Sequence, residues 1–105
     1  MDSALIRQTI EIEGLKILRK YPSDEKLMSY PQEKLNRNVS ALNENGDLVW
    51  RIQEAPHGGG NQDKAYMLIS LENGKLVAGN FIGVDYYVNL QDGTVTPKDT
   101  DARPW

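Results

Sequence analysis

The only histidine of the 105-residue chain, His57, is followed directly by three glycines. A His-Gly-Gly-Gly string can supply the backbone donors of an oxyanion hole, but acyl-transfer chemistry also needs a Gly-x-Ser-x-Gly nucleophile elbow and a base histidine. The sequence has no such elbow, and no histidine remains once His57 is used. We therefore interpret this segment as a flexible glycine-rich loop, and we expect that the protein is not an enzyme.

Carboxylates form two further candidate clusters. Glu11 and Glu13 alternate on a predicted strand, which separates them by about 7 Å, a spacing that could suit paired catalytic carboxylates. Asp99 and Asp101 could bind a cation, but the chain ends before an EF-hand-like loop could be completed. With one histidine and no cysteine, a site of His and Cys ligands is excluded. We interpret both clusters as solvated side chains and expect no metal and no cofactor.

Residues suited to binding a partner lie on the predicted outer faces of the hairpins. Tyrosine and arginine are enriched at binding hot spots, and a C-terminal tryptophan could fold back or contact a partner or a second copy. The candidate partner-binding residues are Arg51, Tyr87, Asn89, Thr94, Thr96 and Trp105. Our first hypothesis is a non-catalytic protein-interaction module of immunity or regulatory type.

The alternative hypothesis is a small-molecule-binding β domain or a minor enzyme. Its pocket would lie in the mouth of a barrel, a common place for ligand sites. Glu11, Tyr86 and His57 are its candidate polar contacts.

Charge and composition limit the partners. The formal net charge is −3, so no overall positive field attracts nucleic acid. The absence of cysteine fits a reducing compartment, and no apolar run is long enough to span a membrane. The first residues lack the basic start and apolar run of a secretion signal. We expect one cytoplasmic domain over residues 1–105.

Three dipeptides, Asn45-Gly46, Asn73-Gly74 and Asp92-Gly93, predict two-residue type I′ hairpin turns. Alternation then directs Trp50, Tyr86 and their same-face neighbours into the core, with Leu48, Met67 and Leu71 among them. A fourth turn at Glu13-Gly14 is less clear, because Glu13 would need a positive φ. Gly14 could instead mark a bulge, and residues 3–12 could begin as a helix.

The whole pattern predicts an all-β antiparallel meander of about eight strands. A meander of this kind protects its edges as a small barrel, a sandwich or a half-propeller-like arrangement, or by pairing with a second copy. Proline and serine signals between residues 23 and 36 predict short helical turns. The expected strands are 4–12, 15–21, 38–44, 47–53, 65–72, 75–81, 84–91 and 94–98.

The hairpin from Asn38 to Ile52, with its Ala-Leu-Asn strand, Gly turn and closing Trp, resembles a blade hairpin of pyrroloquinoline-quinone-type propeller repeats. It departs from that repeat at Asn43, where Asp is usual, and in its shorter turn. No quinone site carries over. The stretch from Ile10 to Val95 is similar to small uncharacterised bacterial β proteins, a resemblance that implies no established activity.

Overall fold

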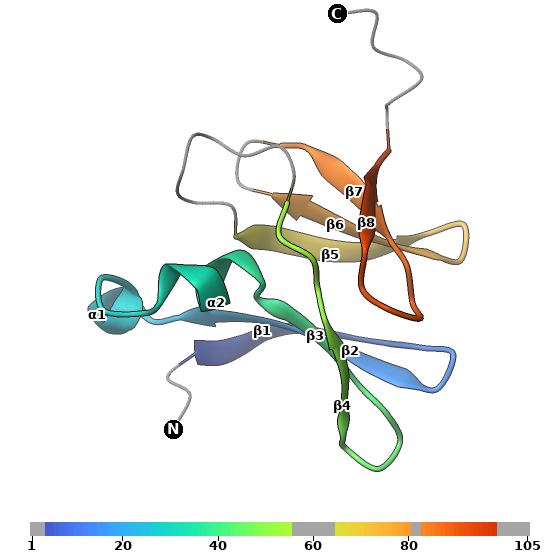
Figure 1. Ribbon diagram of the computed structural model, residues 1–105, viewed down its shortest axis with the longest axis horizontal. Helices are drawn as coiled ribbons and strands as arrows, with labels where there is room; N and C mark the ends of the chain where they lie inside the picture. Colours follow the sequence, from blue (N-terminus) through green and yellow to red (C-terminus); the bar gives the residue numbers. More distant parts are fainter. Residues whose placement is uncertain (1–3, 56–64, 81–82, 99–105) are drawn as a thin grey trace, which may run out of the picture.

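The protein folds into two four-stranded antiparallel sheets, each a simple meander (Figure 1). The computed structural model describes residues 4–55, 65–80 and 83–98. The N-terminal sheet contains β1 (Ala4–Ile12), β2 (Leu15–Pro22), β3 (Val39–Leu42) and β4 (Leu48–Arg51). The C-terminal sheet contains β5 (Tyr66–Glu72), β6 (Lys75–Asn80), β7 (Asp85–Val88) and β8 (Val95–Pro97). The predicted all-β class with eight strands is confirmed, and the described residues form no closed barrel.

Two short helices separate β2 from β3, as the sequence predicts for residues 23–36. They are α1 (Asp24–Leu27), which follows Ser23, and α2 (Gln32–Asn36), which follows Pro31. Within the described ranges, no helix is long and apolar enough to cross a membrane.

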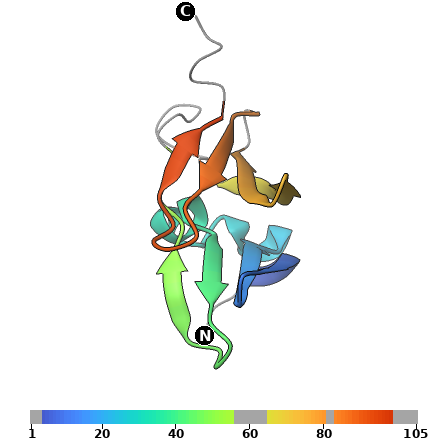
Figure 2. The ribbon, with the colours of Figure 1, turned by 90° about the vertical axis from the view of Figure 1, so that its right-hand side faces the viewer.

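The main core lies between the two stacked sheets (Figure 2). The rings of Tyr66 and Tyr86 meet there edge to face, with centroids 6.2 Å apart, and burial raises the pKa of Tyr66. Trp50 is buried as predicted, and its indole N–H donates to the carbonyl of Leu90 at 2.8 Å. The buried members of this core are Ile17, Val39, Ala41, Trp50, Ile52, Ala55, Tyr66, Ile69, Leu76, Ala78, Tyr86 and Val88.

The first hairpin of each sheet closes with the two-residue turn that the sequence suggests. Asn73 and Gly74 have φ values of 51° and 79°, and Glu13 and Gly14 have 50° and 78°. Both central residues are therefore left-handed, as type I′ turns require. Residues 4–12 are a strand, so the alternatives of a helix there and of a bulge at Gly14 are wrong.

Glu13 occupies a backbone region that asparagine tolerates better than glutamate. We expect Glu13→Asn to raise the free energy of unfolding by about 0.5–1 kcal/mol, measured by urea denaturation. The matched control is the reverse change, Asn73→Glu, at the same position of the other type I′ turn. It should destabilise the protein by a similar amount, and a neutral result for both would contradict the strain at Glu13.

The turns at Asn45-Gly46 and Asp92-Gly93 are not two-residue type I′ turns. In each of these dipeptides the glycine has a positive φ and the residue before it does not. Each loop begins at an asparagine, Asn43 or Asn89, whose side-chain oxygen accepts the N–H two residues later. The longer loop between β7 and β8 shifts the register there, so that Val88 pairs with Val95 where a two-residue turn would pair it with Pro97. Between β3 and β4, Ala41 still pairs with Trp50, as a two-residue turn predicts. The shift is two residues, and the inner and outer faces of β7 therefore stay as predicted.

Three of the predicted core positions are wrong, two of them at strand irregularities and one beside a turn. A register shift between β3 and β4 places Leu48 opposite Leu42, away from the core, and Leu48 is 55% exposed. A bulge at Met67 leaves that residue 37% exposed and turns Tyr66 inward. Leu71, one residue from its turn, remains 46% exposed. A single extra residue reverses the alternation of a strand.

The first hairpins of the two sheets have the same type of turn, but the two sheets bury opposite faces. In both first hairpins a bulge precedes the type I′ turn by six residues, at Arg7 before Glu13 and at Met67 before Asn73. In the N-terminal sheet the pair next to the turn, Ile12 with Leu15, packs on the core, whereas in the C-terminal sheet the core residue nearest the turn is Leu76, which belongs to the next pair along. The two sheets are therefore stacked with corresponding faces pointing in the same direction, so that one sheet buries the face that corresponds to the exposed face of the other.

Side-chain amides of the N-terminal half bind the backbone of edge strand β5. The amide of Asn38 accepts the N–H of Tyr66 at 2.9 Å, and it donates to the carbonyls of Tyr66 and Lys20 at 2.9 and 2.8 Å. In the same manner, Gln8 accepts the N–H of Ile69 and donates to its carbonyl, at 2.9 and 3.1 Å. Each amide takes the place of a neighbouring strand, so this edge is covered.

A third amide joins the opposite side of the two sheets. Gln53 accepts the N–H of Val95 on its side-chain oxygen at 3.0 Å, and its own backbone N–H donates to the carbonyl of Gly93 at 2.9 Å. The carbonyl of Gln53 also accepts the hydroxyl of Tyr66 at 2.8 Å. The sheets are therefore tied at both sides by polar contacts as well as by the core.

Candidate functional site: a basic hollow

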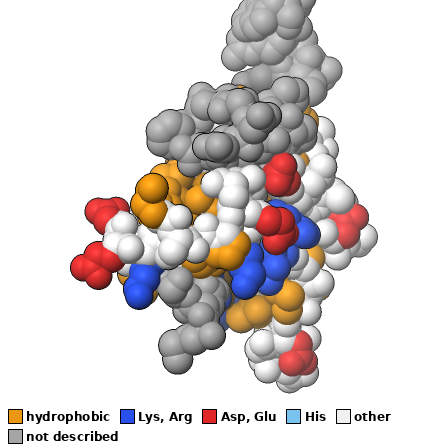
Figure 3. Space-filling view, turned by 60° about the vertical axis from the view of Figure 1, so that its left-hand side comes forward, with side chains coloured by type: hydrophobic (Ala, Val, Ile, Leu, Met, Phe, Trp, Pro, Cys, Tyr) orange, Lys and Arg blue, Asp and Glu red, His pale blue; other side chains and the backbone are white. Residues whose placement is uncertain are grey.

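A hollow of about 340 Å³ lies where α2 meets β2, β3 and β4. Seven residues of the described ranges line it; four of these are cationic, and none of the seven is acidic. Figure 3 shows Lys and Arg side chains gathered on this face of the molecule, with Asp and Glu side chains beside them. The lining residues are Lys20, Tyr30, Lys34, Arg37, Asn38, Ser40 and Arg51. The hollow therefore concentrates positive charge on a chain whose net charge is −3.

Arg37 is held in place by the backbone of the segment that follows Trp50. Its Nε donates to the carbonyl of Ile52 at 3.0 Å, and one terminal nitrogen donates to the carbonyl of Arg51 at 3.2 Å. The other terminal nitrogen lies 3.6 Å from the carboxylate of Glu33. That ion pair is largely exposed, so it offsets little of the local positive charge.

Arg51 and Ser40 face each other across β3 and β4, on the side away from the core. Arg51 and Lys34 are both exposed. In the part of the chain that the structure describes, neither of these two cations has an acidic partner within 4.0 Å. Two cations on different elements are thus available to a ligand that enters the hollow.

The structure places Tyr87 and Thr96 together on the outer face of the C-terminal sheet, as a cross-strand pair. Lys75 and Lys98 flank the Tyr87 ring, with their Nζ atoms 5.1 and 5.9 Å from its centroid. The Nζ of Lys98 also lies 2.7 Å from the carboxylate of Glu72, and this hydrogen bond raises the pKa of Lys98. The cations of this face are therefore already engaged.

The other predicted partner-binding residues are not brought to that face as a group. Asn89 and Thr94 lie in the β7–β8 loop, where the N–H of Asn89 donates to the carbonyl of Thr94 at 2.8 Å. Thr94 also donates from its N–H and its hydroxyl to Asp92. Arg51 belongs to the basic hollow on the other sheet, and Trp105 lies outside the described residues. Their roles in binding remain predictions.

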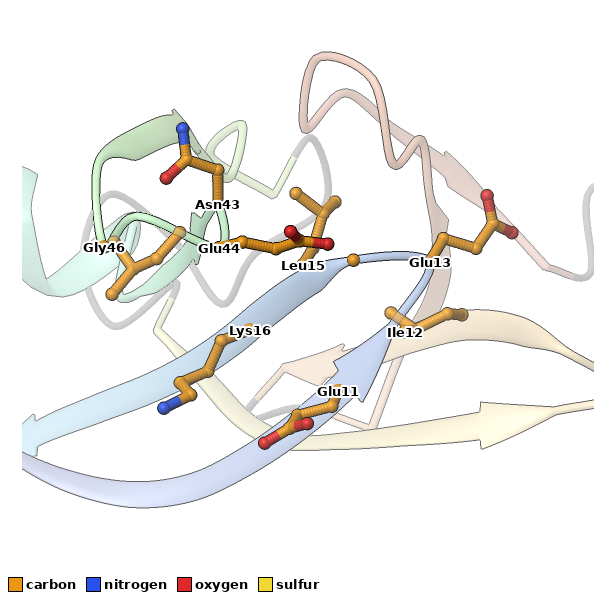
Figure 4. Close-up of a pocket in the computed structure, with 10 residues that line it drawn as sticks. Glu11, Ile12, Glu13, Leu15, Lys16, Asn43, Glu44 and Gly46 are labelled. Carbon is orange, nitrogen blue, oxygen red and sulfur yellow. The ribbon is translucent and has the colours of Figure 1, made fainter.

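Glu11 and Glu13 do not form a carboxylate pair. Both line a cleft of about 440 Å³ between the β1–β2 and β3–β4 turns, but their side chains point in different directions (Figure 4). Glu44, from the other turn, reaches over Gly14, where its Oε2 lies 3.4 Å from the position of an added Cβ.

The remaining polar candidates are either buried or outside the described residues. Tyr86 is fully buried in the core. His57, Asp99 and Asp101 lie outside the described residues. Among the residues that are described, no group of three or more His, Cys, Asp or Glu side chains could hold a metal ion.

Sequence reasoning identified only Arg51 of the four cations in the hollow. The signal it missed is the spacing of Lys34 and Arg37, which are three residues apart at the end of a helical segment and therefore on one side of it. Lys20 comes from a strand far away in sequence, and only the fold brings it to this place.

Comparison with known proteins assigns the chain to a protein family. Searches of curated proteins and of solved structures found no match. A family described as "Domain of unknown function (DUF7957)" matches residues 3–100. Since this match covers almost the whole sequence, the chain belongs to that family.

Proposed function

We propose that this protein is a non-catalytic protein-binding module, of immunity or regulatory type, whose basic hollow receives acidic side chains of its partner. The observation that supports this proposal is the hollow itself, whose lining among the described residues includes four cationic and no acidic side chains. Complementary charge between two surfaces accelerates their encounter and fixes their relative orientation.

The arrangement of the cations fits recognition better than catalysis. Arg37 is fixed by two backbone carbonyls, so little side-chain entropy is lost when a carboxylate binds it. Lys34 and Arg51 stand exposed at the rim, where they can meet a partner before the surfaces close. The charges are accessible to water, and binding is therefore expected to weaken as the salt concentration rises.

Charge reversal in the hollow tests the proposal. We expect Lys34→Glu to weaken capture of the partner from a lysate of the source cells by about tenfold or more, since it replaces attraction by repulsion. Arg51→Glu should act in the same direction. Capture is measured by affinity purification with quantitative mass spectrometry, at low and at high salt.

The matched control is Lys26→Glu, because Lys26 is also an exposed lysine on a short helix but does not line the hollow. It makes the same change in net charge and should leave capture unchanged. A cross-link between the captured protein and residues of the hollow would locate the contact. Equal capture by the wild type and all three variants would refute the proposal.

A further inference from the structure

We infer that a second copy of this chain pairs with the free edge of β1, antiparallel and about a two-fold axis at Ile10. The two N-terminal sheets then join into one continuous sheet. The edge concerned lies opposite β4, the strand that contributes Arg51 to the basic hollow. The inference therefore goes beyond the proposed function and does not depend on it.

Among the described residues, β1 is the long strand that keeps an open edge. It has nine residues, and of the described strands only β2 pairs with it. The amides of Asn38 and Gln8 cover the edge of β5, while β4 and β8 have only four and three residues. Leu5 and Ile6, near one end of β1, are 49% and 57% exposed. A long, partly apolar edge offers its N–H and carbonyl groups to another strand.

The type I′ turn after β1 decides which backbone groups face this edge. In such a turn the residues on either side of it, here Ile12 and Leu15, form a hydrogen-bonded pair. Hydrogen-bonded and non-hydrogen-bonded pairs then alternate along the antiparallel ladder. The N–H and carbonyl groups of Thr9 and Glu11 therefore point away from β2, toward the free edge.

The regular part of the edge is symmetrical about Ile10. The register with β2 is unbroken over residues 8–12, and the bulge at Arg7 precedes this stretch. A two-fold axis at Ile10 aligns residues 8–12 with the same residues of the second copy and places each Thr9 opposite Glu11 of the other copy. These pairs can exchange both of their backbone hydrogen bonds, so the outward groups of both copies are satisfied.

The charges along the strand favour the antiparallel direction. Arg7 is exposed at one end of this stretch, and Glu11 and Glu13 are exposed at the other. Antiparallel pairing brings the Arg7 end of one copy to the glutamate end of its partner. Parallel pairing would place like charges opposite each other, which is destabilising.

In a single copy these charges are not balanced. Burial, and then the nearby charge of Arg7, lower the pKa of Arg19. In the part of the chain that the structure describes, neither arginine forms an ion pair, and neither do Glu11 and Glu13. The second copy therefore supplies opposite charge at both ends of the strand.

Mass measurement on the full chain tests whether the pair forms. Light scattering and sedimentation velocity are carried out between about 1 and 300 μM protein. We expect the apparent mass to rise from that of one chain toward that of two over this range. The mass of a single chain at every concentration would overturn the inference.

Amide hydrogen exchange at the lowest and highest concentrations locates the contact. The N–H groups of Thr9 and Glu11 should become protected only in concentrated solution, because only the second copy binds them. The N–H of Ile10 faces β2 and should be protected at both concentrations, which makes it the internal control. Exchange of Thr9 and Glu11 that does not depend on concentration would overturn the inference.

Charge reversal tests the direction of pairing. Arg7→Glu should weaken the pair by about tenfold or more, since the two-fold axis makes each change act twice. Glu11→Arg should act in the same direction, and the double variant with both changes should restore pairing. Restored pairing also shows that the double variant folds, even if a single variant does not. A double variant that pairs no better than the single ones would overturn the inference.

Arg51→Glu is the matched control, because Arg51 is an exposed arginine at the other edge of the same sheet. It should leave pairing unchanged while it weakens capture of the proposed partner, and Arg7→Glu should do the reverse. The failure of one proposal is therefore distinguishable from the failure of the other. Equal weakening of the pair by Arg51→Glu and Arg7→Glu would show a general effect of net charge and overturn the contact at β1.

Discussion

Gly93→Ala is expected to lower the free energy of unfolding by about 2–4 kcal/mol. A Cβ at this position would lie 2.7 Å from Cε3 and 2.9 Å from Cδ2 of Trp50, and 3.2 Å from the carbonyl oxygen of Arg51. The indole cannot move aside easily, because it is buried and its N–H is bound to Leu90. Overpacking of this kind costs about 1–3 kcal/mol, and the positive φ of Gly93 adds about 1 kcal/mol.

Gly46→Ala is the matched control, since Gly46 has a similar φ of 85° and no atom within 4 Å of the added Cβ. Only the backbone strain of about 1 kcal/mol should remain there. Both variants can be compared by urea denaturation followed through tryptophan fluorescence. Equal losses of stability would show that only the backbone angle requires glycine at position 93, and would contradict the contact with Trp50.

Asn38→Ala is expected to cost about 3 kcal/mol or more, which is a large part of the stability of an ordinary domain. The change leaves the N–H and carbonyl of Tyr66 and the carbonyl of Lys20 without their amide partner. Asn38 and Tyr66 are buried, so water cannot easily replace the lost bonds. Each buried group left unsatisfied costs about 1–3 kcal/mol.

The control for Asn38 is Asn45→Ala, an exposed asparagine that contributes its backbone N–H to the β3–β4 loop. That variant should lie within about 0.5 kcal/mol of the wild type. Thermal unfolding and amide hydrogen exchange of Tyr66 provide the measurements. Unchanged protection of the Tyr66 amide in Asn38→Ala would contradict the role assigned to this side chain.

The predictable part of the fold comes from local backbone chemistry. Asn73-Gly74 sets its hairpin register because both residues accept a positive φ, and the pairs from Glu72 with Lys75 to Ile69 with Ala78 follow from it. The outer position of Tyr87 and the inner position of Tyr86 follow from simple alternation. Such features depend on residues close together in sequence.

The unpredicted part depends on contacts between distant residues. The bulge at Met67 has no local sequence signal, yet it decides that Tyr66 enters the core. The packing of Gly93 against Trp50 likewise joins segments far apart in the chain.

The candidate site is less predictable than the fold. Alternation predicts Arg51 on an outer face, but its neighbours Lys20 and Lys34 in the hollow are far from it along the chain. Alternation on one hairpin cannot bring these side chains together. Tyr87 and Thr96 were grouped correctly, because they belong to adjacent strands of one hairpin.

Because corresponding faces of the two sheets point in the same direction, the stacking has a consequence for the face-to-face assembly of two copies. The surface that the N-terminal sheet turns to solvent corresponds to the surface that the C-terminal sheet buries, so the two outer sides of the molecule are different in kind. A pair of copies related by a two-fold axis places like against like. Such a pair would use one of these sides twice and leave the other uncovered on both subunits.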